Sequence, residues 1–160
     1  MAVRPFVKED IHPLKEILEV TGAFRKEEIE VALELMDIVI EEPEQQDYLM
    51  FTSVDENNVV QGYYCVGPTP MTERTYDLYW IAVDVRRQGT GASRELIEHC
   101  IGLVASKGGT KIIAETSSQT SYGRTHAFYG KHGFREEARI SGYYSPGDDL
   151  VIYSRQLQGG

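Results

Sequence analysis

Residues 75–116 constrain the fold more than any other part of the chain. The strand expected at 75–84 is apolar on both of its alternating faces. These faces carry Leu78, Trp80 and Ala82 on one side, and Tyr79, Ile81 and Val83 on the other. A glycine-containing turn, an amphipathic helix ending near Lys107 and a short apolar strand at 110–116 follow. Parallel strands need a long crossover of this kind, so the segment predicts a βαβ unit whose first strand is covered on both sides.

The other hydrophobic patterns complete an α+β domain around this unit. Further strands are expected at 3–6, 47–54, 59–66, 134–140 and 150–157, and helices at 8–20, 25–42 and 122–132. No repeat or linker divides the chain, and 160 residues is a common size for one domain. We therefore expect a single domain over residues 1–160.

Charge limits the classes of partner. The net charge is −9, with 15 acidic and 5 basic residues in positions 1–60 against 10 acidic and 11 basic in positions 61–160. A chain this acidic is poorly suited to phosphate backbones, so no nucleic-acid partner is expected. The uneven distribution favours a C-terminal part that hosts an anion and an N-terminal part that attracts a cation. A solvated acidic face that keeps the protein soluble is the alternative.

Compartment is indicated by hydropathy and cysteine content. No run of 18 apolar residues occurs, and the first five residues lack the apolar core of a secretion signal. Cys65 and Cys100 are too few for a disulfide scaffold and lack metal-ligand spacing. We expect a cytoplasmic protein with no metal and no membrane partner.

The turn between the strand at 75–84 and the next helix has the features of an anion site. Glycine allows close backbone approach, and the first turn of a helix presents unpaired N–H groups with a partial positive charge. The candidate binding residues are Arg86, Arg87, Gln88, Gly89, Thr90, Gly91, Ala92 and Ser93. No Gly-Lys-Ser/Thr follows, and position 94 is Arg rather than Gly, so neither a P-loop nor a dinucleotide fingerprint is present. A tight strand-to-helix turn without a ligand is the alternative.

A second sequence motif follows this turn, and the two motifs together are more informative than either alone. Residues 125–134 read Thr-His-Ala-Phe-Tyr-Gly-Lys-His-Gly-Phe, about forty residues after Arg86-x-x-Gly89-x-Gly91. Together they resemble the two cofactor segments of the GNAT superfamily of acetyl-CoA-dependent N-acetyltransferases. The resemblance implies a three-layer α/β arrangement in which a mixed, splayed sheet of about seven strands has helices on both faces. It also implies direct transfer of acetyl from acetyl-CoA to an amine, without an acyl-enzyme.

The resemblance assigns roles to individual residues. It implies that Tyr129 is the general acid that protonates the leaving thiolate, and a phenol with a pKa near 10 can do so. A packing aromatic is the alternative. Asp77 or Glu115 is the expected base, and either could instead be an ordinary strand-end carboxylate.

Cofactor contacts are implied along the same two segments. The backbone of Ile81, Ala82 and Val83 corresponds to the strand that pairs with pantetheine, and Phe128 and Lys131 fall in the second segment. Lys131 is expected near a cofactor phosphate or in solvent. Tyr122 stands where many family members have Asn, so an aromatic contact would replace an amide hydrogen bond.

The family places its first two helices and closing hairpin over the acceptor. Here these parts carry acidic and aromatic residues: Glu27, Glu30, Glu34, Asp37, Tyr143, Tyr144, Asp148 and Asp149. We therefore predict a cationic acceptor: a small amine, a polyamine or a peptide amine. A helix face in solvent and a simple hairpin turn are the alternatives. A non-catalytic acyl-CoA-binding module on the same fold is the alternative function, and the resemblance is also compatible with a homodimer.

Overall fold

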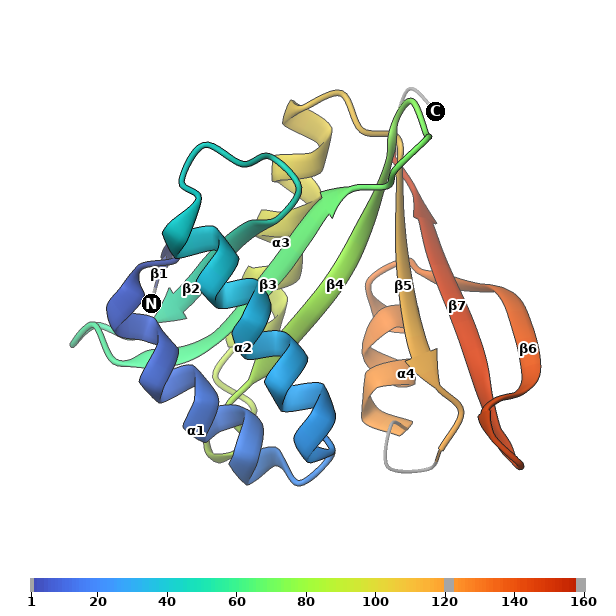
Figure 1. Ribbon diagram of the computed structural model, residues 1–160, viewed down its shortest axis with the longest axis horizontal. Coiled ribbons are helices and arrows are strands. Elements are labelled where there is room, and N and C mark those ends of the chain that lie inside the picture. The colour runs from blue at the N-terminus through green and yellow to red at the C-terminus, as the bar shows by residue number, and fades with distance from the viewer. Residues whose placement is uncertain (1, 120–122, 158–160) are drawn as a thin grey trace.

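The computed structural model describes residues 2–119 and 123–157, which form one seven-stranded sheet and four α-helices (Figure 1). The strands are β1 (Ala2–Pro5), β2 (Leu49–Val54), β3 (Val60–Pro68), β4 (Thr75–Val83), β5 (Lys111–Ser117), β6 (Arg135–Ser145) and β7 (Asp148–Gln156). The helices are α1 (Ile11–Thr21), α2 (Lys26–Glu41), α3 (Ala92–Ser106) and α4 (Gly123–Lys131), with 3-10 turns η1 (Lys8–Asp10) and η2 (Val85–Arg87). In the described residues, no helix is long and apolar enough to cross a membrane.

The strands lie in the order β1-β2-β3-β4-β5-β7-β6. The pair β4–β5 is parallel, and α3 is its crossover, as the sequence predicts. The other five neighbouring pairs are antiparallel. The expected α+β fold with a mixed sheet is therefore confirmed. The last hairpin is longer than expected, since β6 continues past residue 140 and closes at Ser145 opposite Asp148.

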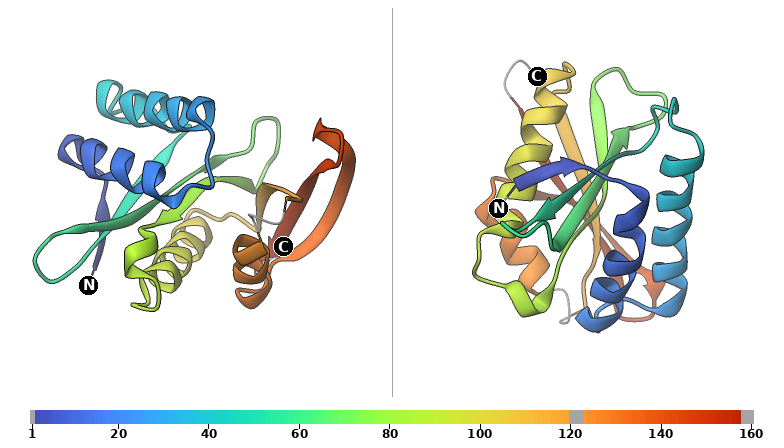
Figure 2. Two further views of the ribbon diagram at one scale, coloured as in Figure 1. Left: turned by 90° about the horizontal axis from the view of Figure 1, so that it is seen from below. Right: turned by 90° about the vertical axis from the view of Figure 1, so that its left-hand side faces the viewer.

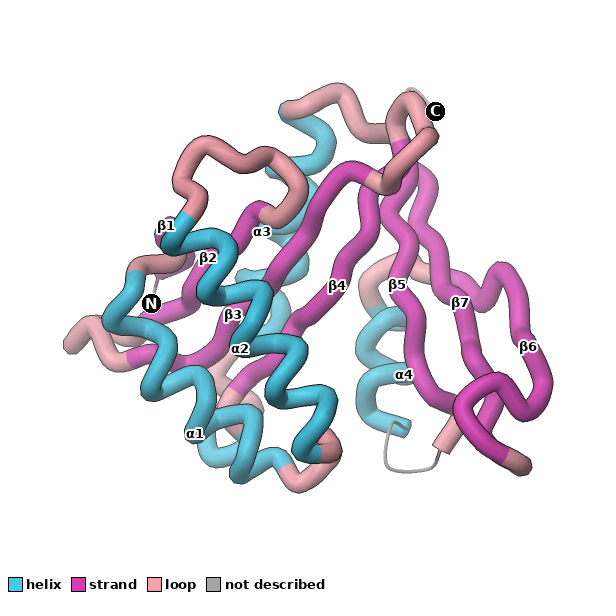
Figure 3. Tube along the Cα trace, viewed as in Figure 1, coloured by secondary structure: helices cyan, strands magenta, loops and turns pink. Residues whose placement is uncertain are grey.

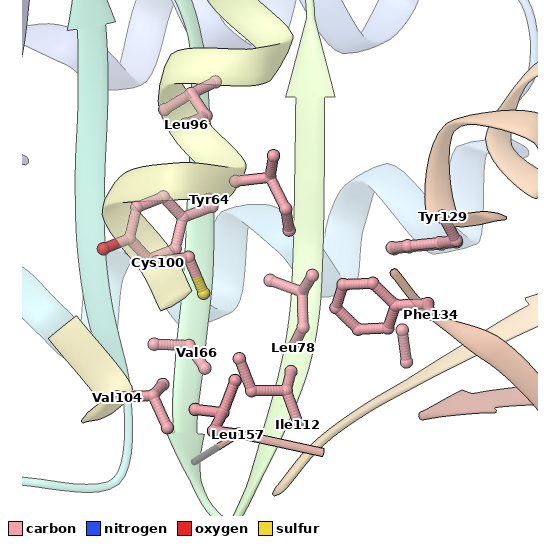
Figure 4. Close-up of a cluster of buried hydrophobic side chains, with 12 residues drawn as sticks. Tyr64, Val66, Leu78, Leu96, Cys100, Val104, Ile112, Tyr129, Phe134 and Leu157 are labelled. Atoms are coloured by element: carbon pink, nitrogen blue, oxygen red, sulfur yellow. The ribbon is translucent and has the colours of Figure 1, made fainter. Parts of the chain in front are cut away.

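Helices cover both faces of the sheet (Figure 2). Helices α1 and α2 pack over one face, on a cluster that includes Leu14, Met36 and Tyr63. Helices α3 and α4 pack over the other face, on a cluster that includes Leu96 and Tyr129. Figure 4 shows this second cluster, in which side chains from α3, α4, β4 and β5 meet. The sheet is thus the middle of three layers.

A β-bulge at Tyr79 interrupts the alternation of β4. Cys65 of β3 pairs with Trp80, whereas the next residue, Val66, pairs with Leu78, so Tyr79 has no partner on β3. Leu78 consequently packs on the α3 side of the sheet, together with Ile81 and Val83, whereas Trp80 and Ala82 pack on the α1–α2 side. The prediction that Leu78 shares a face with Trp80 and Ala82 is wrong, because one extra residue reverses the side-chain alternation beyond it.

The sheet opens between β4 and β5. Their pairing covers three residues of β4, from Thr75 to Asp77, opposite Lys111 to Ile113. Beyond this point the strands diverge, as Figure 3 shows for the lower halves of the two strands. The bulge at Tyr79 immediately follows the last pair and increases the local twist of β4. A wedge-shaped gap between two halves of the sheet results.

Candidate active site in the opening between β4 and β5

A cavity of about 460 Å³ occupies this opening. Its walls come from the α1–α2 connection, the first turn of α2, β4, β5, α4 and the β6–β7 hairpin. They are lined by Ala23, Phe24, Arg25, Glu28, Tyr79, Trp80, Ile81, Glu115, Thr116, Ser117, Gln119, Thr125, Tyr129, Tyr144, Ser145 and Asp148. Segments from all parts of the chain therefore meet at one concave site, the usual form of a small-molecule site.

Tyr129 forms the α4 wall of this cavity. Its side chain is 5% exposed and packs against Phe134 and Tyr153, with ring centroids 5.1 and 5.5 Å away. Figure 4 shows its ring between α4 and β4. No described residue hydrogen-bonds to its hydroxyl, which is not among the fully buried unpaired atoms and is therefore accessible from the cavity. Burial raises the pKa of Tyr129 above its ordinary value of 10, so the hydroxyl is a neutral donor that lacks an acceptor.

Three carboxylates line the cavity with Tyr129. Glu115 is on β5, Glu28 is in the first turn of α2, and Asp148 begins β7. All three act on the phenol of Tyr144: burial raises the pKa of Tyr144, and the negative charges of Glu115, Asp148 and Glu28 raise it further. The cavity therefore has one acidic side, centred on Tyr144.

Two of these carboxylates have partners that orient them. Glu28 Oε1 accepts hydrogen bonds from the backbone N–H of Arg25 at 2.9 Å and from its Nε at 3.3 Å. Asp148 accepts a hydrogen bond from the hydroxyl of Ser117. The carboxylate of Glu115 makes no hydrogen bond or ion pair with another described residue, although its backbone pairs with Ile152 in the sheet. Glu115 is exposed and is the carboxylate of the cavity without a partner among the described residues.

Asp77, the other expected base, is not part of the cavity lining. It pairs with Gly67 and Ile113 at the end of the parallel segment. Its charge raises the pKa of Tyr79, after the larger effect of burial, so Asp77 lies near Tyr79, which does line the cavity. The structure brings Glu115 and Tyr129 together in one cavity and leaves Asp77 out of it.

The glycine turn leads into the N-terminus of α3. Gly91 is the N-cap residue and has a φ of +91°, and Gly89 has a φ of +84°, values that favour glycine. No side chain caps this helix. The N–H groups of its first turn, at residues 92–94, therefore need an external acceptor, as an anion site requires.

Arg86 and Arg87 hold the turn in place. Asp84, which is buried, accepts hydrogen bonds from the backbone N–H, Nε and Nη2 of Arg86 at 3.0, 2.8 and 3.0 Å. These bonds keep the pKa of Asp84 below its usual value. Arg86 Nη1 also reaches Glu16 at 3.2 Å, and Arg87 Nη1 reaches Asp55 at 2.9 Å. Both guanidinium groups are thus neutralised by carboxylates.

Helix α4 contacts the turn with a different arginine. Arg124, in its first turn, donates a hydrogen bond to the side-chain oxygen of Gln88. Lys131 is the last residue of α4, at the opposite end from this contact, and is exposed. Phe128 packs edge-on against Tyr129. The predicted contact of Tyr122 lies outside the described residues.

The residues expected to bind the acceptor are only partly brought together. Tyr144 lines the cavity, but Tyr143 does not and is 56% exposed. Glu27, Glu30 and Glu34 are exposed on α2 outside the lining, where Glu28 contributes instead. Glu28 and Arg124 have no sequence signal, since neither is in a motif and the role of each depends on how separate elements meet.

The family model for acetyltransferases of the GNAT family matches residues 14–134. The chain belongs to this family. The resemblance predicted from the sequence is confirmed, and the protein is an acetyltransferase. Its family uses acetyl-CoA as the acetyl donor. A search of curated protein sequences finds no match.

Solved structures agree with this assignment. A protein from Desulfovibrio desulfuricans assigned to the GNAT family is 38% identical, with a TM-score of 0.91 over 97% of this chain and 98% of that one. The ribosomal-protein-S18-alanine N-acetyltransferase from Escherichia coli is 18% identical, with a TM-score of 0.78 over 99% and 95%. An aminoglycoside 6'-N-acetyltransferase, crystallised with coenzyme A, is 16% identical, with a TM-score of 0.75 over 98% and 97%. The last two share the GNAT fold with this chain.

Proposed function

We propose that this GNAT protein transfers the acetyl group of acetyl-CoA directly to the amine nitrogen of a small cationic acceptor in the cavity between β4 and β5. One observation carries the proposal: the buried, unpartnered phenol of Tyr129 and the unpaired carboxylate of Glu115 line the same cavity. A proton donor and a proton acceptor in the lining of one cavity are the two groups that amide formation from a thioester needs.

The residues of the glycine turn fit a diphosphate. The uncapped N-terminus of α3, with Gly91 at the N-cap, supplies backbone donors and a partial positive charge. The pairing of β4 with β5 ends before Ile81, Ala82 and Val83. The edge of β4 that faces β5 is therefore available at these residues to an extended, amide-containing part of the cofactor. Arg86 and Arg87 act indirectly, because their ion pairs fix the turn that precedes Gly91.

Glu115 is the proposed base and Tyr129 the proposed acid. An aliphatic ammonium has an ordinary pKa of about 10.4 and must lose a proton before it attacks, and Glu115 takes it. The nitrogen then bonds to the thioester carbon and loses a second proton to water, and the carbon–sulfur bond breaks. The hydroxyl of Tyr129 donates its proton to the leaving sulfur and is protonated again from solvent. No serine or cysteine nucleophile takes part.

The proposal is tested by measuring CoA release from acetyl-CoA with a panel of amines. We expect turnover with cationic amines and none with alcohols or anionic nucleophiles. Glu115→Gln should lower kcat/KM by about 100-fold, since general bases contribute roughly this factor or more. Asp77→Asn is the matched control outside the cavity and should retain activity.

Two results would contradict the proposal. Acetyl-CoA binding in calorimetry without CoA release for any amine would favour a non-catalytic binding module. Loss of activity in Asp77→Asn but not in Glu115→Gln would reverse the assignment of the base.

The proposal also includes a cytoplasmic location. Cys65 and Cys100 are both buried free thiols, as is usual in a reducing compartment.

A further inference from the structure

We infer that the acceptor is a small aliphatic diamine or polyamine, and that Glu28 and Asp148 hold its second ammonium group beside Tyr144. This inference rests on the proposed function, because it concerns the acceptor side of the same cavity. It names two specificity-determining residues that have no part in the proton transfers.

Charge within the cavity supports a doubly charged acceptor. Among the described lining residues, three are acidic, Glu28, Glu115 and Asp148, and one is basic, Arg25. Three carboxylates against one guanidinium leave two negative charges. A monoamine would neutralise one of them, whereas a diamine neutralises both.

The carboxylates converge on one aromatic ring. Glu28, Glu115 and Asp148 come from three separate elements, yet each is close enough to raise the pKa of Tyr144, in addition to the effect of burial. Tyr144 packs edge-on against Tyr143, with ring centroids 4.9 Å apart. An aromatic ring with carboxylates nearby can bind an ammonium group through both charge and cation–π attraction.

The side chain of Tyr129, which comes from a different element than the carboxylates, also points to a ligand in this cavity. It is 5% exposed and lines the cavity, and no described residue accepts its hydrogen bond. If Glu115 takes the proton of the reacting amine, Glu28 and Asp148 are left for the second charge. Neither is fully neutralised: Glu28 shares its charge with the exposed Arg25, and Asp148 is bonded to a neutral hydroxyl.

The described residues favour an ammonium group over a metal ion. No three acidic, histidine or cysteine side chains in this part of the chain are close enough to hold a metal. The remaining wall is apolar, with the rings of Phe24 and Trp80 5.2 Å apart. A methylene chain between two ammonium groups matches such a wall, and a volume of about 460 Å³ suits a small molecule.

The test compares α,ω-diaminoalkanes with n-alkylamines of the same chain length. Wild-type kcat/KM should be about tenfold higher or more for the best diamine, which is about 1.4 kcal/mol. Asp148→Asn and Glu28→Gln should each raise KM for the diamine about tenfold more than KM for the monoamine of the same chain length. Both variants keep the acceptor oxygens that bond Ser117 and the Arg25 N–H, so folding is preserved.

Glu27→Gln is the matched control, since it removes the same charge one position away on α2, outside the cavity. It should leave both amines unaffected. Equal kcat/KM for diamines and monoamines, an equal effect of Glu27→Gln and Glu28→Gln, or turnover of peptide amines alone would overturn this inference while leaving acetyl transfer intact. Absence of CoA release with every amine would instead overturn the proposed function itself, and this inference with it.

Discussion

Replacing Tyr129 by phenylalanine removes one hydroxyl from the centre of the site and separates its catalytic role from its structural role. The ring would remain packed against Phe134 and Tyr153. The hydroxyl bonds to no described residue, so no hydrogen bond within the described structure is lost. We expect the variant to be about as stable as wild type, because the hydroxyl is accessible from the cavity and has no partner among the described residues.

The expected catalytic loss comes from the general contribution of a positioned acid. Burial raises the pKa of Tyr129 above its ordinary value of 10, so the phenol is protonated and can donate as the carbon–sulfur bond breaks. General acids contribute about 100-fold or more, so we expect Tyr129→Phe to lower kcat by about 100-fold.

The assay is CoA release under saturating acetyl-CoA and amine, with thermal unfolding measured on the same samples. Tyr153→Phe is the matched control, because Tyr153 stacks on Tyr129 but does not line the cavity. It should keep kcat within about twofold, which is less than 0.5 kcal/mol. A Tyr129→Phe variant with wild-type kcat, or one whose loss of activity matches a loss of folded protein, would refute the reasoning.

Three further predictions concern stability and cofactor binding. Asp10→Asn breaks the ion pair in which Arg4 lies 2.8 Å from the buried Asp10, and should lower the free energy of unfolding by about 2 kcal/mol in urea titrations, whereas an unchanged midpoint would contradict this. Burial alone would raise the pKa of Asp10, but its hydrogen bonds, chiefly from Arg4, lower it. Its stabilising effect is thus complete above pH 3.8 and is lost as the pH falls through the lowered value, and wild type and Asp10→Asn should converge in acid. Gly67→Ala should destabilise by about 3 kcal/mol, since its Cβ would lie 1.8 Å from the carbonyl oxygen of Asp47, and a soluble variant with the wild-type melting temperature would argue against that contact. Gly91→Asp places a side chain and a negative charge at the N-terminus of α3, and should weaken acetyl-CoA binding by about tenfold or more in calorimetry, whereas unchanged affinity of the folded variant would remove the turn from the site.

Local patterns were sufficient for most of the fold. The apolar strand at 75–84, the helix after Gly91 and the strand near 111 predict the crossover that the structure contains. The bulge at Tyr79 has no sequence signal, because an apolar residue there fits regular alternation equally well. A single inserted residue was enough to move Leu78 to the other face.

The candidate site was less predictable, because it depends on how side chains from distant elements meet. Asp84 and Asp55 lie near Arg86 and Arg87 only after folding, so the sequence could not show that both arginines are paired. Which glutamate of α2 reaches the cavity depends on the position of that helix over the sheet. A difference of one residue, Glu28 instead of Glu27, corresponds to about 100° around the helix.

The three-residue contact between β4 and β5 gives the sheet two internal edges. Past Asp77 and Ile113, both strands present backbone N–H and C=O groups to a space that another strand would normally fill. An extended ligand with amide groups can join either edge as a short guest strand. While it is bound as a substrate, the acyl donor would also fill the gap in the sheet and link β1–β4 to β5–β7. We expect the two halves to unfold more nearly as one unit when it is bound.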